Sequence, residues 1–293
     1  MEYDLITILG PTASGKTKYA VRAAKKLGAE IISADSRQVY RGMDIGTGKD
    51  LCEYQDVPYH LIDIVDAGEK YNIFEYQRDF ENAYQDIISR GKRAILCGGS
   101  GLYIESVTQG YKLQEVAPNP ELRAELERYS DQELIAKLQS LKPLHNSTDY
   151  DTRKRLIRAL EIAIYQNEHP IVESNFLPKR TKYIGINVDR DTRNYKIDKR
   201  LDQRLEEGML REVQSLLDSG ISPEDLIYYG LEYKFITLHL IGELTFNEMR
   251  NKLAIAIHQF AKRQMTWFRG MERRGIDIVW VDPDSEIDEI LNF

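Results

Sequence analysis

The segment GPTASGKT, from Gly10 to Thr17, constrains the fold of this chain more than any other feature. It fits the phosphate-loop pattern GxxxxGK(S/T) and lies between an apolar run, Leu5–Leu9, and a helical pattern over about residues 16–27. Lys16 offers a charge to phosphate oxygens, Thr17 offers a hydroxyl that can ligate Mg²⁺, and the helix adds its positive N-terminal end. The pattern predicts a phosphorylated ligand, with ATP, GTP or another phosphate left open, held by Gly10, Pro11, Thr12, Ala13, Ser14, Gly15, Lys16 and Thr17.

Strand and helix patterns alternate after this loop. We expect strands at AEIISADS, HLIDIV, RAILCGG and YIGINV, with a helix over about residues 73–89. This alternation predicts an α/β fold, a P-loop NTPase-like parallel sheet flanked by helices. Helical patterns replace it over residues 115–178, which we interpret as a helical insertion domain between core segments 1–114 and 179–293. Two C-terminal helices are expected, one with an apolar stripe from Ile197 to Val213 that ends near Gly220, and one over about residues 246–269.

Polar residues follow two of the expected strands. Asp35 comes just after IISA, and Ser100 follows AILCGG. Ligands of parallel α/β sheets bind beyond the carboxyl ends of strands, so these residues and the phosphate loop should share one cleft. An NTP hydrolase usually ends such an apolar strand with a Mg²⁺-binding Asp, whereas this strand ends in glycines. The polar cluster at this edge of the sheet is therefore expected to recognise the substrate, and not to hold a metal; it consists of Asp35, Ser36, Arg37 and Gln38.

Composition is that of a globular enzyme, with 42% apolar and 30% charged residues in 293 positions. No apolar run reaches membrane-span length, the N-terminus does not read as a signal peptide, and the two cysteines form no metal or redox motif, so we expect a cytoplasmic protein. The net charge of −7 does not favour nucleic-acid binding by the chain as a whole, but the segments RKRLIR, PKRTK and AKRQMTWFRGMERR are locally basic.

The motifs together resemble one enzyme family. GPTASGKT, IISADSRQVYRGMDIGTGK, VPYHLIDIV, LCGGSGLYIESV, KRLIRALEI and AKRQMTWFR match segments of the tRNA dimethylallyltransferases, in the family's order and over nearly the whole chain. The resemblance implies transfer of a dimethylallyl group from dimethylallyl diphosphate to N6 of an adenosine beside the anticodon of tRNA. It also implies that the loop holds the prenyl diphosphate, with Mg²⁺ as cofactor.

The resemblance assigns roles to individual residues. Asp35 would accept a proton from the adenine amino group or orient it, Ser100 would hydrogen-bond the diphosphate or the amine, and Lys16 and Arg200 would face the diphosphate. Structural ion pairing of Arg200 with Asp202 or Glu206 is the alternative. Thr17 is the expected metal ligand. The residues expected to contact tRNA are Asp35, Ser36, Arg37, Gln38, Ser100, Lys154, Arg155, Leu156, Ile157 and Arg158.

Other roles at these and nearby positions stay open. Arg158 and Glu161 could instead be structural ion-pair partners on their helix, and Lys262, Arg263 and Arg269 could steer the phosphate backbone of tRNA. Trp267 and Phe268 are expected in the core, and His60 is expected to be structural. The partners are the anticodon stem-loop of tRNA and dimethylallyl diphosphate, with no membrane and with the chain acting as a monomer.

This chain departs from the family pattern at several positions. Ser100 stands where the family has Thr, which keeps the hydroxyl, and the family's GYKE appears as EYKF, which places Glu232 at the glycine. Further departures are Arg204 for a methionine, Ile257 and His258 for Thr-Arg, and Tyr59 for one of two histidines. Two main alternatives remain at this stage: a prenyltransferase of free adenine nucleotides, and a P-loop kinase of small molecules. A non-catalytic RNA-binding protein is a third alternative, against which the intact Asp35, Lys16 and Thr17 argue.

Overall fold

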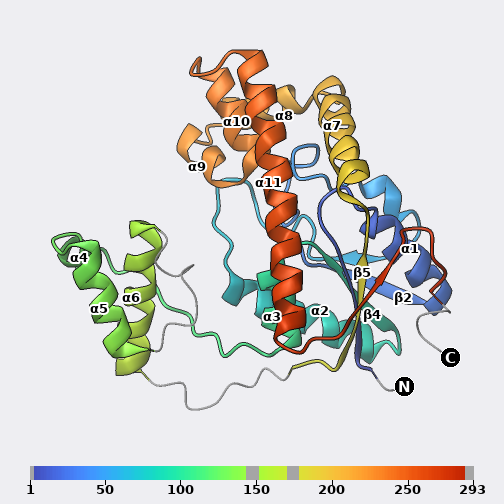
Figure 1. Cartoon of the computed structure of the whole chain (residues 1–293), viewed down its shortest axis with the longest axis horizontal. Coiled ribbons are helices and arrows are strands. Elements are labelled where there is room, and N and C mark those ends of the chain that lie inside the picture. Colours follow the sequence, from blue (N-terminus) through green and yellow to red (C-terminus); the bar gives the residue numbers. More distant parts are fainter. Residues whose placement is uncertain (1–2, 143–151, 170–177, 288–293) are drawn as a thin grey trace. The chain divides into compact units, whose positions relative to one another are not determined.

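The structure is a computed structural model that describes residues 3–142, 152–169 and 178–287. The chain divides into two compact units, one formed by residues 1–110 with 178–293 and the other by residues 111–177 (Figure 1). Each unit has its own hydrophobic cluster.

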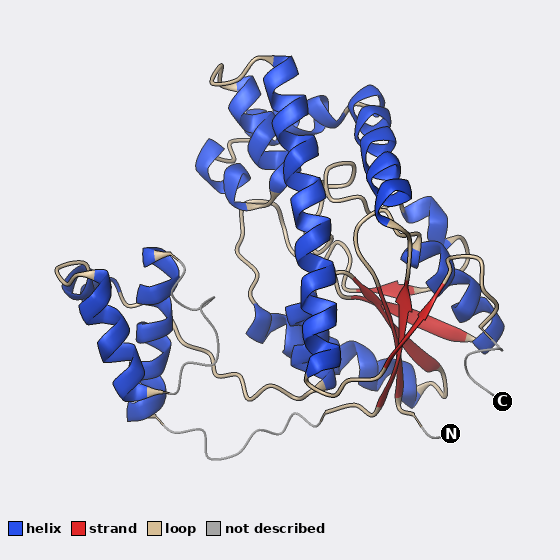
Figure 2. Ribbon diagram, in the orientation of Figure 1, coloured by secondary structure: helices blue, strands red, loops and turns tan. Residues whose placement is uncertain are grey.

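The first unit contains a parallel sheet with strand order β3-β2-β4-β1-β5-β6 (Figure 2). The expected α/β fold is therefore confirmed. Since β4 lies between β1 and β2, the carboxyl ends of these three strands are neighbours at one edge of the sheet. The strands are β1 (Leu5–Leu9), β2 (Ala29–Ser33), β3 (Tyr59–His60), β4 (Arg93–Gly98), β5 (Thr181–Ile186) and β6 (Ile278–Val281).

Helices cover this sheet and extend beyond its carboxyl edge. The connection through α1 runs from β1 past β4 to β2, and the connection through α2 runs in the opposite direction along the sheet, from β3 past β2 to β4. Because both crossovers are right-handed, α1 and α2 lie on opposite faces of the sheet. The long α11 contacts α10, α7 and α3 (Figure 1). The helices are α1 (Lys16–Leu27), the 3₁₀ turn η1 (Leu51–Tyr54), α2 (Ile73–Ser89), α3 (Gly101–Thr108), α7 (Arg190–Glu207), α8 (Met209–Asp218), α9 (Pro223–Tyr228), α10 (Leu231–Leu240) and α11 (Phe246–Arg273).

The core of this unit lies between the sheet and α1. Ile8, Ile31, Ile95 and Ile184, one from each of four strands, are fully buried in a cluster that includes Tyr19 of α1. Apolar residues fill both faces of these strands, as a parallel sheet covered by helices requires. The strands are thereby fixed in the register that sets the positions of the loops after them.

Two of the expected elements differ in the structure. HLIDIV continues as a strand only to His60, because Leu61 and Asp63 adopt left-handed φ angles of 61° and 56°. The apolar stripe from Ile197 to Val213 belongs to two helices, since Gly208, at φ 108°, ends α7 and precedes α8. β6 and α10 were not expected from the sequence.

The second unit is a small helical bundle in its described part. It contains α4 (Pro120–Leu126), α5 (Asp131–Leu141) and α6 (Arg153–Glu168), which share a buried cluster around Leu126, Leu134 and Leu160. Asn119 caps α4 by accepting from the Leu122 N–H at 3.0 Å, and Ser130 and Glu133 form a capping box on α5. Parts of the expected insertion, residues 143–151 and 170–177, lie outside the described residues.

The length and apolar character of the described helices show whether any of them could span a membrane. Within residues 3–142, 152–169 and 178–287, the helices lack the combination of length and apolar character that would let one cross a bilayer.

Candidate active site

The phosphate loop connects β1 to α1 with a backbone shape that its sequence allows. Gly15 adopts a left-handed φ of 87°, and Ala13 is also left-handed at 61°. The helix begins at Lys16, whose Nζ donates to the Pro11 carbonyl across the loop at 3.4 Å. Because this hydrogen bond is long, the ammonium group can turn toward an anion in the loop at little cost.

The charge of Lys16 is set by its surroundings. Burial lowers the pKa of Lys16, and the nearby Asp35 opposes that shift. Burial also raises the pKa of the neighbouring Cys97 thiol to about 12, so this cysteine stays neutral at physiological pH. A bound phosphate would restore the stability of the lysine's charged form, which makes the loop electrostatically suited to an anion.

Asp35 lies in a turn that starts directly after β2. Its Oδ1 accepts from the Arg37 N–H at 2.9 Å, and its own N–H donates to the Ser33 hydroxyl at 3.3 Å. Among the described residues, no hydrogen bond reaches its other oxygen, Oδ2. The carboxylate is thus held by a backbone turn while one oxygen remains available to a substrate.

Ser100 lies beside this turn. Its hydroxyl accepts from the Ser36 N–H at 3.3 Å, and its own N–H donates to the Ala34 carbonyl at 3.2 Å. Gly101 follows as the first residue of α3 and lies against the indole of Trp267, where a Cβ would clash. The structure therefore brings Ser100 and the Asp35 segment together, as their positions after β4 and β2 predict.

A cavity opens in front of the phosphate loop. It is a small, partly open pocket that lies between the phosphate loop, α7, α8, α10 and α11. Its apolar wall consists of Ile197, Leu201, Met209 and Ile257, and its polar wall of Thr12, Arg200, Arg204 and Glu232, with Ala13 at the loop. Arg200 pairs with Asp50 at 2.6 Å, not with Asp202 or Glu206. A phosphate loop beside an apolar wall suits a ligand that has both a phosphorylated end and a hydrocarbon end.

Comparison with known proteins assigns the chain to a family. The sequence profile described as IPP transferase matches residues 38–271, and that described as isopentenyl transferase matches residues 3–56. A tRNA dimethylallyltransferase 2 of Bacteroides fragilis is 58% identical over 296 residues, covering 100% of this chain and 97% of the relative. The chain belongs to the IPP transferase family. It is a tRNA dimethylallyltransferase, a prenyltransferase of tRNA modification, and the kinase alternative is therefore excluded.

Solved structures of IPP transferases share the fold. The full-length tRNA isopentenylpyrophosphate transferase of Bacillus halodurans aligns with a TM-score of 0.70 at 36% identity, covering 99% of this chain and 93% of the other. A eukaryotic dimethylallyltransferase aligns with a TM-score of 0.78 at 24% identity over 98% of this chain and 76% of the other, which shows the fold alone.

In this IPP transferase, Gln264 joins the two glycine loops, a role that sequence reasoning missed. Its Oε1 accepts from the Thr12 N–H at 2.8 Å, and its Nε2 donates to the Gly99 carbonyl at 3.0 Å. Gln264 is buried on α11, which carries the family segment AKRQMTWFR. That segment was the available signal, but only the fold shows which backbone groups the side chain reaches.

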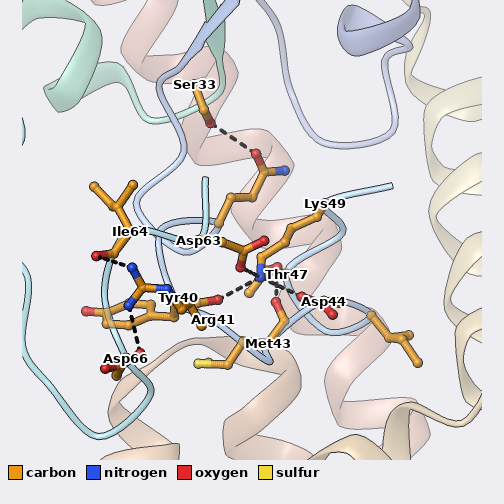
Figure 3. A network of polar contacts seen from close by, with 12 residues as sticks. Ser33, Tyr40, Arg41, Met43, Asp44, Thr47, Lys49, Asp63, Ile64 and Asp66 are labelled. Carbon is orange, nitrogen blue, oxygen red and sulfur yellow. Dashed lines mark hydrogen bonds and ion pairs between the residues drawn. The ribbon is translucent and has the colours of Figure 1, made fainter. Parts of the chain in front are cut away.

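A buried lysine organises the segment that follows the Asp35 turn (Figure 3). Lys49, only 1% exposed, donates to the Tyr40 carbonyl at 2.7 Å and to Asp44 at 2.6 Å, and it also pairs with Asp63. Gln38 braces the same segment, because its Oε1 accepts from Ser33 Oγ and its Nε2 donates to the Gly48 carbonyl, both at 3.0 Å. Both ends of the Gln38 amide are thus engaged inside the protein.

The residues of α6 expected to contact tRNA fall into two groups. Leu156 and Ile157 are 1% and 4% exposed in the core of the second unit, so their side chains pack internally, and a contact of this segment with tRNA stays a prediction. Arg158 pairs with Glu161 and donates to the Val116 carbonyl at 2.8 Å, so a structural role is evident for it. Lys154 and Arg155 are exposed, and their contact with tRNA stays a prediction.

The structure also tests the expected positions of two aromatic residues and one histidine. Phe268 is fully buried, as expected, whereas Trp267 is 36% exposed, so its expected place in the core is wrong. The Trp267 Nε1 donates to Glu105 at 2.6 Å, which holds the ring against α3 at the surface. His60, the last residue of the edge strand β3, lies 2.7 Å from Glu30 in an ion-pair network, as a structural histidine should.

Proposed function

We propose that this enzyme transfers the dimethylallyl group of dimethylallyl diphosphate to N6 of an adenosine adjacent to the anticodon of tRNA, releasing diphosphate. The single observation that carries the proposal is the convergence of the phosphate loop, Asp35 and Ser100 at the carboxyl ends of β1, β2 and β4, next to a cavity with an apolar wall. A cytoplasmic location, with both cysteines free, is part of the proposal.

The donor would bind with its diphosphate in the loop. The N–H groups of the loop and the N-terminus of α1 favour an anion there, and Lys16 and Arg200 add charges on its two sides. The isoprenoid tail would lie against the apolar wall that includes Ile197, Leu201 and Ile257. Negative charge grows on the leaving diphosphate, so these fixed positive groups stabilise the transition state.

The acceptor would approach from the Asp35 side. An adenine inside an anticodon loop must be unstacked into a pocket before its amino group can react. The N6 nitrogen forms a bond to C1 of the dimethylallyl group while the bond from C1 to the diphosphate oxygen breaks, and the N6 proton passes to Asp35. Ser100, whose hydroxyl already contacts the Asp35 segment through the Ser36 N–H, would orient the amine or the diphosphate.

A Mg²⁺ ion fits the donor set at the loop. Within the described residues, no cluster of three or more His, Cys, Asp or Glu side chains could hold a metal by itself. Mg²⁺ commonly takes one or two protein ligands and completes its shell with substrate phosphates and water, so the Thr17 hydroxyl at the start of α1 would suffice. The ion would supply charge neutralisation to the departing diphosphate.

Each unit carries exposed cations that are candidates for contacts with tRNA. Lys154 and Arg155 of α6 are exposed, as are Lys262, Arg263 and Arg269 of α11. Such side chains would bind the RNA backbone through phosphate contacts that do not depend on sequence. The Asp35–Arg37 turn would contact the reacting nucleotide, with the Arg37 guanidinium resting 5.6 Å from the Tyr228 ring centroid.

The proposal is tested by assaying transfer to unmodified tRNA and to free AMP in parallel, with mass spectrometry of the digested RNA. The wild-type enzyme should prenylate tRNA adenosine. Asp35→Asn keeps an oxygen that can accept from the Arg37 N–H but cannot take a proton, so single-turnover transfer should fall about 10²- to 10⁴-fold with donor affinity unchanged.

The control is Asp218→Asn, at the exposed end of α8, which should transfer at the wild-type rate. Prenylation of AMP without prenylation of tRNA would overturn the substrate assignment. Undiminished transfer by Asp35→Asn would overturn the role of Asp35 as the base.

A further inference from the structure

Three charged side chains line the donor cavity in front of the phosphate loop. They are Arg200 and Arg204 of α7 and Glu232 of α10. Arg204 lies one helical turn after Arg200 on α7, so both guanidinium groups reach the same side of the helix.

Both arginines converge on one carboxylate. Arg200 Nη2 donates to Asp50 Oδ2 at 2.6 Å, and Arg204 Nη2 donates to the same oxygen at 3.1 Å and to Oδ1 at 3.3 Å. Asp50 is the only one of the three that is clearly exposed, and it precedes the short turn η1 with a left-handed φ of 44°. Its carboxylate therefore sits on the surface side of two partly buried cations.

The backbone below these guanidinium groups is built for close approach. Gly48 has a left-handed φ of 66°, and a Cβ at this glycine would clash with both Arg204 Nη2 and Arg200 Nη2. The Gly48 carbonyl is held by Gln38, which connects it to Ser33 beside Asp35. The two guanidinium groups thus pack on a segment that hydrogen bonds connect, through Gln38, to the strand end beside Asp35.

The charges in this part of the cavity do not balance. Both guanidinium groups form ion pairs with the exposed Asp50 carboxylate. Burial raises the pKa of Glu232 and of Glu53, two further carboxylates near Arg200, which weakens them as counter-ions. Burial, and next the charge of Arg200, lowers the pKa of Arg204, so its charged form lacks sufficient compensation. A ligand with several negative charges would match the pair better than one carboxylate does.

We propose that Arg204 is a second diphosphate-binding arginine and that Asp50 is an internal anion which both arginines exchange for the diphosphate of the donor. The inference rests on the proposed function for the identity of the donor. A carboxylate accepts from guanidinium groups much as a phosphate does, and Asp50 holds the two side chains in their binding orientation. It also competes with the donor, so its removal should strengthen binding.

The test is calorimetric titration of the full-length protein with dimethylallyl diphosphate and, separately, with inorganic diphosphate. Arg204→Met removes the charge while keeping a long side chain, and it should weaken the binding of both ligands about tenfold or more, as expected for a lost charge-assisted hydrogen bond. Arg204→Lys should recover part of the loss. Asp50→Asn, a change at an exposed residue, should bind both ligands about threefold or more tightly, which is the readout that a purely structural ion pair would not give.

The matched control is Arg250→Met, which breaks the Arg250–Asp202 pair between α11 and α7 at 2.9 and 2.8 Å, and diphosphate affinity should not change. Unaltered diphosphate binding by Arg204→Met, or binding by Asp50→Asn no tighter than wild type, overturns the inference. So does a wild-type protein that binds neither ligand. Intact diphosphate binding without prenyl transfer to tRNA would instead refute the proposed function and leave this site standing.

Discussion

At the scale of single residues, Gln264 links the two glycine loops through one side-chain amide. Its amide satisfies two backbone groups, the Thr12 N–H and the Gly99 carbonyl, in a position only 8% exposed. Gln264→Leu removes both hydrogen bonds at nearly constant volume. We expect the free energy of unfolding to fall by about 1–3 kcal/mol, because buried polar groups lose their partner, and the KM for the donor to rise as the loop loosens.

Urea denaturation and steady-state kinetics measure these two effects. Gln259→Leu changes an exposed glutamine on the same helix and should leave both values as in the wild type. If Gln264→Leu loses stability but keeps its donor KM, the side chain supports the fold without positioning the phosphate loop.

At the scale of elements, a buried carboxylate ties β2 to β3 and to the end of α2. Glu30 accepts from Arg90 Nη2 at 2.8 Å and lies 2.7 Å from His60, and the hydrogen bonds from Arg90 lower the pKa of Glu30 from 4.5 to about 2. A carboxylate with a lowered pKa stabilises the fold above its unfolded pKa, and this contribution disappears as the pH falls from about 4.5 to about 2. We expect Glu30→Gln to cost about 3 kcal/mol at pH 7 and to flatten the acid limb of stability.

Urea midpoints between pH 7 and pH 2 check this expectation. Asp86→Asn removes the exposed partner of the same arginine and should cost under about 1 kcal/mol, since surface ion pairs contribute little. If the stability of Glu30→Gln still falls steeply below pH 4.5, other carboxylates cause the loss of stability in acid.

The elements also show what the sequence can and cannot predict. The loop from Gly10 to Thr17 is contiguous, and Asp35 and Ser100 follow strands whose order a parallel sheet limits, so one cleft could be foreseen. The Asp50–Arg204 pair joins residues 154 positions apart and depends on how α7 packs, which no local pattern encodes. β6 escaped notice because its four residues show no alternation, and it is a strand only through pairing with β5.

At the scale of the whole molecule, the two units have separate cores, and we expect their ligands to be separable too. Lys154 and Arg155 of α6 are exposed cations of the second unit and are its candidates for phosphate contacts. Replacing both with Gln should weaken tRNA binding and reduce the slope of log affinity against log salt by about one to two, because fewer counter-ions are released.

Diphosphate affinity should stay unchanged in this double variant, because the described residues that line the donor cavity belong to the first unit. The control replaces Lys112 and Arg128, two other exposed cations of the second unit, with Gln and alters the net charge equally. Filter binding at several salt concentrations separates the two cases. An equal loss of slope in both double variants would mean that only the overall charge of the unit matters, whereas an unchanged slope in the Lys154 and Arg155 variant would remove α6 from the tRNA surface. When Arg204→Met is added to the Lys154 and Arg155 double variant, the losses in diphosphate binding and in tRNA binding should be those of the separate variants, since the two sites share no partner residue.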